Sequence, residues 1–160
     1  MSITLKNLES ALAGESMAHI KYRYFAKLAR ESGYEDVAKH FEHTADQEIL
    51  HAWGHLELLI GKPSVTESLQ MAIDGETHEF EVMYPRMQIE AGVEKMDNAF
   101  KEFGEQIEES REHAEQFAQI LEKAEKRFAA LKKVEEKHAN AYKQVLEGVS
   151  NFQQMKQEIA

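Results

Sequence analysis

Two short motifs in the sequence place a carboxylate and an imidazole one helical turn apart. Glu48 and His51 are three residues apart, and so are Glu135 and His138. On a helix this spacing puts both side chains on one face, where they can share a metal ion. An isolated Glu-x-x-His is more often a solvated helix face, so its meaning depends on the surrounding sequence.

A repeated Gly-Glu-hydroxyl pattern precedes each motif. Gly14-Glu15-Ser16 precedes the first, and Gly75-Glu76-Thr77 precedes the second. Each half of the chain therefore offers one Glu followed by a Glu-x-x-His, which indicates two related helical hairpins. Four Glu and two His form the ligand set of a carboxylate-bridged dinuclear site in a helix bundle. Without metal, six such groups in one core would be too costly to desolvate. The pattern therefore predicts two divalent ions.

The elements that position these groups are predicted to be helices throughout. Apolar residues recur at helical spacing, and the chain has only two prolines. Gly33 and Gly61-Lys62-Pro63-Ser64 interrupt the pattern. We expect an all-α fold, a four-helix bundle of two hairpins in a single domain over residues 1–160. Its helices are predicted at about residues 4–32, 35–60, 65–103 and 105–148.

Composition narrows the classes of function. The formal net charge of −10 disfavours nucleic acid and anionic membrane as partners. The absence of Cys excludes a disulfide framework and a thiolate-ligated metal. The sequence has no apolar run long enough to span a bilayer and no charged-then-apolar leader, so we expect a cytoplasmic protein without a membrane span.

Taken as a set, these motifs resemble the rubrerythrin family of the ferritin-like superfamily. The resemblance covers most of residues 4–85 and 124–149. It is carried by Ala13-Gly14-Glu15-Ser16, Tyr22 to Gly33-Tyr34-Glu35, Glu48-x-x-His51, Gly75-Glu76-x-x-Glu79, Met83-Tyr84-Pro85 and Glu135-x-x-His138-Ala139-Asn140. It implies that two iron ions are bound by Glu15, Glu48, His51, Glu76, Glu135 and His138, with Glu79 as a seventh ligand.

Glu79, the seventh ligand, has no carboxylate counterpart in the first half of the chain. Aligning the hairpins on Glu15 and Glu76 puts Ala18 opposite Glu79, so only the second half has the extra carboxylate. The predicted site is therefore asymmetric, and one iron could exchange Glu79 for a nearby histidine as its charge changes. A plain solvated glutamate is the alternative interpretation of Glu79.

The resemblance implies a di-iron peroxidase, an oxidoreductase that reduces hydrogen peroxide during oxidative stress. Its electrons would come from an external donor such as rubredoxin, because these 160 residues contain no Cys for the rubredoxin domain that the family often appends. Glu79 would serve the reaction, and Tyr22 and Tyr84 would donate hydrogen bonds to the carboxylates. Ordinary core packing is the alternative for both tyrosines.

Two other functions stay open at this point. One is a ferritin-like ferrous iron oxidase or iron store that uses oxygen. The other is a helical interaction protein with a merely structural metal. Carboxylate and imidazole ligands suit manganese as well as iron, and zinc is a further possible substitute.

The position of each hairpin turn can be predicted from its ligands, because the turn should fall midway between ligands at one level. For Glu15 and His51 the midpoint is Gly33. For Glu76 and His138 it is residue 107, near Gly104. The separation between Glu76 and His138 is wider than the rubrerythrin family usually shows. Relative to the family, we therefore expect the third and fourth helices to be longer by about 12 residues each, or about 18 Å.

A competing alignment uses Ser110-x-x-His113 in place of the second Glu-x-x-His. Because Ser110 replaces the required carboxylate, we interpret His113 as a bystander.

The link between the hairpins is short. From Leu59 to Val65 the chain reaches about 20 Å, whereas a ferritin-like crossover needs about 28 Å. We therefore expect a homodimer in which the hairpins are domain-swapped.

Overall fold

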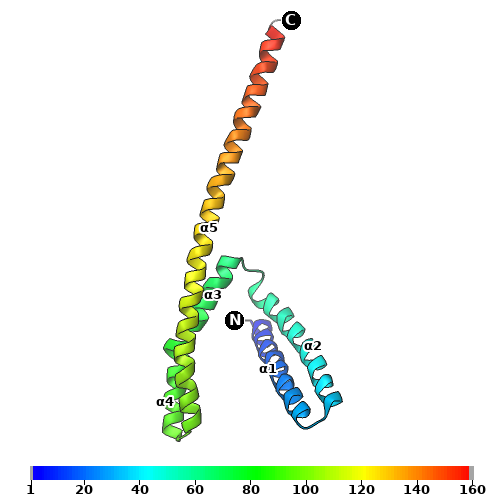
Figure 1. Cartoon of the computed structure of the whole chain (residues 1–160), viewed down its shortest axis with the longest axis vertical. Helices are drawn as coiled ribbons and strands as arrows, with labels where there is room; N and C mark the ends of the chain where they lie inside the picture. The colour runs from blue at the N-terminus through cyan, green and yellow to red at the C-terminus, as the bar shows by residue number, and fades with distance from the viewer. Residues whose placement is uncertain (1, 159–160) are drawn as a thin grey trace. The chain divides into compact units, whose positions relative to one another are not determined.

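The computed structural model describes the backbone of residues 2–158 and the side chains of residues 2–149. Each element in this part of the chain is helical, as the sequence predicts. The elements are α1 (Ile3–Glu31), α2 (Glu35–Ile60), α3 (Val65–His78), the π-helical segment η1 (Glu79–Met83), α4 (Tyr84–Glu94) and α5 (Asp97–Glu158). Residues 1–63 and 64–160 form two units, each a helical hairpin (Figure 1). Among the described residues, no helix has the length and apolar character needed to cross a bilayer.

Local hydrogen bonds fix both ends of α1. The Ser2 hydroxyl accepts a hydrogen bond from the Leu5 amide at 3.2 Å and caps the start of the helix. At its end Gly33 adopts a φ of 83°, and the Tyr34 amide donates to the Ala29 carbonyl at 2.9 Å. This is a Schellman ending, which needs a residue in the left-handed region and favours glycine there. The turn falls at the midpoint expected for the first hairpin.

Small residues allow α1 and α2 to pack closely. Ala38, Ala45 and Ala52 are seven residues apart on α2 and are at most 1% exposed. This spacing puts them in one stripe, where the short side chain lets the facing helix approach. Tyr22 and Phe41 extend the contact, with ring centroids 5.9 Å apart. The stripe therefore fixes which residues of α1 and α2 lie at the same level.

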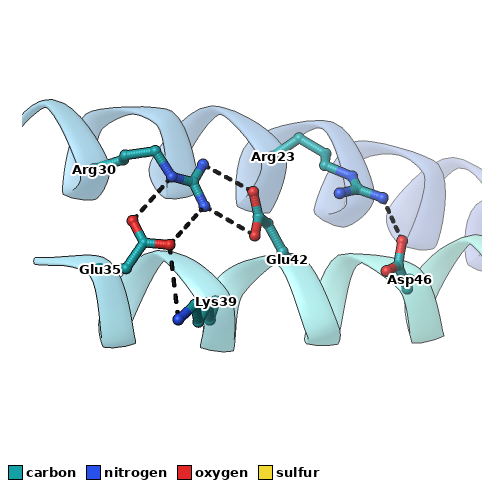
Figure 2. Close-up of polar contacts among 6 residues, drawn as sticks. All are labelled: Arg23, Arg30, Glu35, Lys39, Glu42 and Asp46. Carbon is teal, nitrogen blue, oxygen red and sulfur yellow. Dashed lines mark hydrogen bonds and ion pairs between the residues drawn. The ribbon is translucent and has the colours of Figure 1, made fainter.

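Charged residues bridge the two helices near their turn (Figure 2). Arg30 of α1 donates to both carboxylate oxygens of Glu42, at 2.9 and 3.0 Å, and to Glu35 at 3.1 Å. Further along the hairpin, Arg23 pairs with Asp46. Hydrogen bonds from Arg30 hold the pKa of Glu42 below its usual value of 4.5. The pairing therefore stabilises the hairpin above that pH.

The substitution Arg30→Gln tests this contribution. Above pH 4.5 the variant should unfold at a lower urea concentration than the unaltered chain, because Glu42 loses its charged partner. A pKa lowered by folding gives stability that is lost as pH falls through the folded value, so the difference should shrink below pH 4.5. Urea midpoints across this range measure it. A difference that is unchanged in acid would contradict the assignment.

The second hairpin begins at a capping box. The Glu67 amide donates to the Ser64 hydroxyl at 3.3 Å, and the Ser64 amide donates to the Glu67 carboxylate at 2.7 Å. The helical stretch α3–η1–α4 then ends at Lys95, whose φ of 59° is left-handed. The Met96 amide donates to the Ala91 carbonyl at 2.9 Å. This is the same Schellman ending as in the first hairpin, with lysine where the first has Gly33.

The turn of the second hairpin is therefore at Lys95–Met96, and the expected turn near residues 104–107 is wrong. The predicted helix over residues 65–103 ends at Glu94, and the one predicted over 105–148 begins at Asp97. Gly104 lies inside α5, where a Cβ atom would meet the Gln88 amide nitrogen at 2.6 Å. The absence of a side chain at residue 104 leaves room for the end of the Gln88 side chain, whose Nε2 donates to the Phe100 carbonyl at 3.3 Å.

Replacing Lys95 with glycine distinguishes the two turn positions by the sign of its effect. In the left-handed turn, Lys95→Gly should raise the free energy of unfolding by about 1 kcal/mol, because a side chain is strained there. Inside a continuous helix the same change would lower it by about 1 kcal/mol. Urea unfolding measures the difference. Lys101→Gly, within α5, is the control and should destabilise.

Candidate metal centre

The first hairpin brings together three potential ligands. Glu15 of α1 and Glu48 and His51 of α2 each offer one ligand atom, and these atoms lie within 4.8 Å of one another. The Glu48 carboxylate is 3.1 Å from His51 Nδ1. Both carboxylates are half-buried and the imidazole is exposed. The donors are carboxylate oxygens and an imidazole nitrogen, which suit iron, manganese or zinc.

A related group lies at the corresponding level of the second hairpin. The Glu76 carboxylate of α3 is 3.6 Å from Nδ1 of His113 on α5. Glu79, the first residue of η1, accepts a hydrogen bond from the Ser110 hydroxyl at 3.0 Å. Glu76 and His113 also line a cavity of about 250 Å³, with Phe117 among its apolar walls. The second hairpin therefore pairs the Glu76 carboxylate with one imidazole and bonds a second carboxylate, Glu79, to Ser110. Among the described residues, only the first hairpin has three ligand atoms within 4.8 Å of one another.

The two groups contain the same ligand types in a different arrangement. Glu15 corresponds to Glu76 and His51 corresponds to His113, because each pair has the same separation from its own turn to within one position. The second carboxylate comes from opposite helices of the two hairpins. In the first hairpin it is Glu48, and the corresponding residue of the second hairpin is Ser110. In the second hairpin it is Glu79, and the corresponding residue of the first is Ala18. Each hairpin thus offers two carboxylates and one imidazole. In the second hairpin residue 110 is a serine, and the second carboxylate is that of Glu79.

Ser110 is set apart by its burial. It is 3% exposed and is the one buried polar residue among the described side chains. A serine is small enough to fit in the seam between α5 and η1, and its hydroxyl gives the Glu79 carboxylate a donor there. Arg111, the next residue, stacks over the Phe80 ring at 4.6 Å and holds the same two helices together.

Glu135 and His138 are not brought to Glu76 in this structure. They lie in the distal half of α5, where both are exposed. Along the helix, His138 lies about 37 Å beyond His113. The expected pairing assumed a turn near residue 107, and the observed turn brings His113 to the level of Glu76 instead. That Glu135 and His138 bind metal thus stays a prediction that this hairpin does not support.

The two tyrosines lie in apolar surroundings. Tyr22 packs on Phe41, and Tyr84 stands 6.2 Å from Phe103 between ring centroids. Burial raises the pKa of Tyr84, and the nearby charges of Glu79 and Glu76 raise it further. Its phenol therefore keeps its proton near the carboxylates. A hydrogen-bonding role for either tyrosine stays a prediction.

Sequence reasoning missed His113 and Ser110 as members of the site. The Ser110-x-x-His113 alignment was available but lacked a carboxylate, and no glycine marked the true turn. The sequence around Lys95 thus carried no signal of the turn, and Gly104 was the more conspicuous candidate.

Helical hairpins that carry carboxylates and histidines within ligand distance define the class of ferritin-like carboxylate–histidine proteins. The Rubrerythrin family model matches residues 6–121, well over half of the sequence, and the chain belongs to the rubrerythrin family. The match includes His113 and ends before Glu135.

Two sequence relatives agree with this assignment, nigerythrin and Rubrerythrin-2. Over 96 residues the chain is 41% identical to nigerythrin of Nitratidesulfovibrio vulgaris, covering 51% of the chain and 48% of that protein. It is 31% identical to Rubrerythrin-2 of Clostridium acetobutylicum over 130 residues, covering 72% and 71%. A solved structure of fully reduced, all-ferrous nigerythrin is 32% identical, with a TM-score of 0.39 over 78% of this chain and 69% of that one. The chain spans about half the length of nigerythrin.

Ser110→Ala tests the contact between the hydroxyl and Glu79. Removing a buried donor to a carboxylate should lower the free energy of unfolding of the metal-free protein by about 1 kcal/mol. Urea unfolding measures this loss. The matched control is Ser10→Ala, because the exposed Ser10 hydroxyl bonds only to the Lys6 carbonyl within α1. The control should change stability by less than about 0.5 kcal/mol. Equal losses in both variants would contradict the assigned contact.

Proposed function

We propose that the chain is a di-iron peroxidase that reduces hydrogen peroxide with electrons from an external donor. The observation that carries the proposal is the group of two carboxylates and one imidazole within ligand distance in the first hairpin, in a chain of the rubrerythrin family. The contacts of Glu76 with His113 and of Glu79 with Ser110 in the second hairpin support it. Hydrogen peroxide takes up two electrons and two protons and yields two waters. Two bound irons would supply one electron each, and a rubredoxin-like donor would return them.

The proposed ligands are shared equally between the hairpins: Glu15, Glu48 and His51 from the first, and Glu76, Glu79 and His113 from the second. Four carboxylates carry four negative charges, which two divalent cations neutralise. Each hairpin alone offers too few donors for two ions, so both hairpins are required. His113 replaces His138 in the set expected from the sequence, and Glu79 supplies the fourth carboxylate in place of Glu135.

Glu79 is the carboxylate best suited to respond to a change of metal charge. It begins the π-helical segment η1, and such segments interrupt regular helical hydrogen bonding and are frequent at functional sites. Ser110 donates to one carboxylate oxygen of Glu79 and leaves the other available to a metal. The neutral phenol of Tyr84 nearby is a candidate proton donor to the reacting oxygen.

A domain-swapped homodimer is the assembly that we propose. The link between α2 and α3 is only residues 61–64, which supports pairing of one chain's first hairpin with the second hairpin of another. An 18.4 kDa monomer that retains both irons would contradict it. The cytoplasmic location stays a prediction.

An anaerobic titration of metal-free protein with ferrous iron tests the function. We expect two irons per chain, followed by faster oxidation of the loaded protein by peroxide than by oxygen. Faster oxidation by oxygen, with release of ferric iron, would favour a ferritin-like iron oxidase. Binding without redox turnover would favour a structural metal in a helical interaction protein. Parallel titrations with manganese and zinc test the alternative metals.

Two histidine variants test the ligand assignment in the same titration. His113→Gln removes one proposed ligand and should weaken binding of one iron by at least about tenfold. His138→Gln is the matched control and should bind both irons normally. The reverse pattern, with loss only in His138→Gln, would restore the ligand set expected from the sequence.

A further inference from the structure

The helix α5 extends well beyond the helices that pack against it. The stretch α3–η1–α4 begins at Val65, which lines a shallow groove with Arg127, Phe128 and Leu131. Every residue of α5 from 125 to 149 is exposed.

The exposed part of α5 continues the apolar seam of the packed part. Between residues 100 and 124 the seam positions alternate in steps of three and four: Phe100, Phe103, Ile107, Ser110, Ala114, Phe117, Leu121 and Ala124. The same steps continue without interruption through Phe128, Leu131, Glu135, His138, Tyr142, Val145 and Val149. This is the a/d pattern of a coiled coil. The first half of the seam packs on α3, η1 and α4, so the second half continues an established interface.

The residues that flank the second half of the seam are mostly small or apolar, as in closely packed helices. Of the six e and g positions between residues 131 and 149, five are apolar or small: Val134, Ala139, Ala141, Leu146 and Gly148. Charged side chains occupy the b, c and f positions on the opposite side: Lys133, Glu136, Lys137, Lys143 and Glu147. A helix with this pattern buries a wide stripe against a partner. Phe128, Leu131, Tyr142 and Val145 are now 49 to 75% exposed.

The order of residues along the seam is self-complementary. In an antiparallel coiled coil an a position of one helix meets a d position of the other. Centred between Glu135 and His138, this pairing sets Phe128 against Val145 and Leu131 against Tyr142. It also sets each Glu135 against the partner's His138. Two carboxylate–imidazole pairs therefore lie at the centre, with apolar layers on both sides.

We propose that residues 128–145 of α5 form an antiparallel coiled coil with the same residues of a second copy of this chain. The apolar layers drive the association, and the central pairs fix its register and direction, as buried polar groups do in other coiled coils. This interface is distinct from the exchange of hairpins between chains. It rests on the proposed function in one respect, which is that Glu135 and His138 bind no iron.

The absence of Cys in the chain permits a direct test by site-directed cross-linking. Leu131→Cys and Tyr142→Cys are made separately in the full-length protein, mixed, and oxidised mildly. A short bis-maleimide provides a second probe. We expect a cross-linked dimer of twice 18.4 kDa from the mixture, and little from either variant alone. Residues 131 and 142 of one helix are about 16 Å apart, so the bond must join two chains.

The other outcomes overturn the proposal. Cross-linking of each variant with itself would indicate a parallel pair. No cross-link in any mixture would mean that another partner, or the chain's own first hairpin, covers this face. Lys133→Cys mixed with Tyr142→Cys is the control and should not cross-link, because position 133 lies on the outer face. Ferrous titration of the same variants reports folding and the iron site independently, so failure of the interface and failure of the proposed function are distinguishable.

Discussion

The position of the helix–helix turn governs which side chains of each hairpin can meet. A Schellman ending lets one helix stop and the next begin within two or three residues, so the two helices run antiparallel with a fixed register. The histidine proposed as a ligand follows the left-handed residue by the same number of positions in both hairpins, from Gly33 to His51 and from Lys95 to His113. If the connection between the two helices moved along the sequence by one turn of α-helix, each imidazole would lie about 11 Å from its carboxylate along the helix. The ligand geometry therefore depends on backbone hydrogen bonds far from the ligands.

The seam between the helices has to accept polar groups without losing its packing. Alanines at 38, 45 and 52 provide a close contact in the first hairpin, and Ala91 and Ala114 do so in the second. Such short side chains leave room for carboxylates at the same interface. Ser110 extends this principle, since it has nearly the volume of alanine and also supplies a hydrogen bond to Glu79. The second hairpin thus has a carboxylate at Glu79, the first residue of the π-helical segment, and none at residue 110.

Much of this architecture follows from the sequence, and the exceptions have physical causes. Gly33 marked the first turn because glycine readily adopts a positive φ, and the cluster of Glu15, Glu48 and His51 was predicted from helical spacing. Lys95 gave no comparable signal, because its left-handed conformation is uncommon for lysine. Because of the second Glu-x-x-His motif, the predicted register paired Glu76 with His138, further along α5 than His113, which Glu76 contacts. Repeated seams on one helix make such registers equivalent in sequence, and only the turn distinguishes them.

The charge distribution suggests why α5 is so long. Residues 64–125 contain sixteen Asp or Glu and five Lys or Arg, a net charge of −11 in a chain of −10. The negative electrostatic potential of this segment attracts cations to the carboxylates, but it also makes copies of the chain repel one another. Residues 126–149 reverse the sign, with six Lys or Arg against three Glu. Association through this distal segment keeps the acidic hairpins of two copies at opposite ends of the contact, several Debye lengths apart at physiological ionic strength. The length of α5 thus separates the carboxylates proposed to bind cations from the surface proposed to bind another chain.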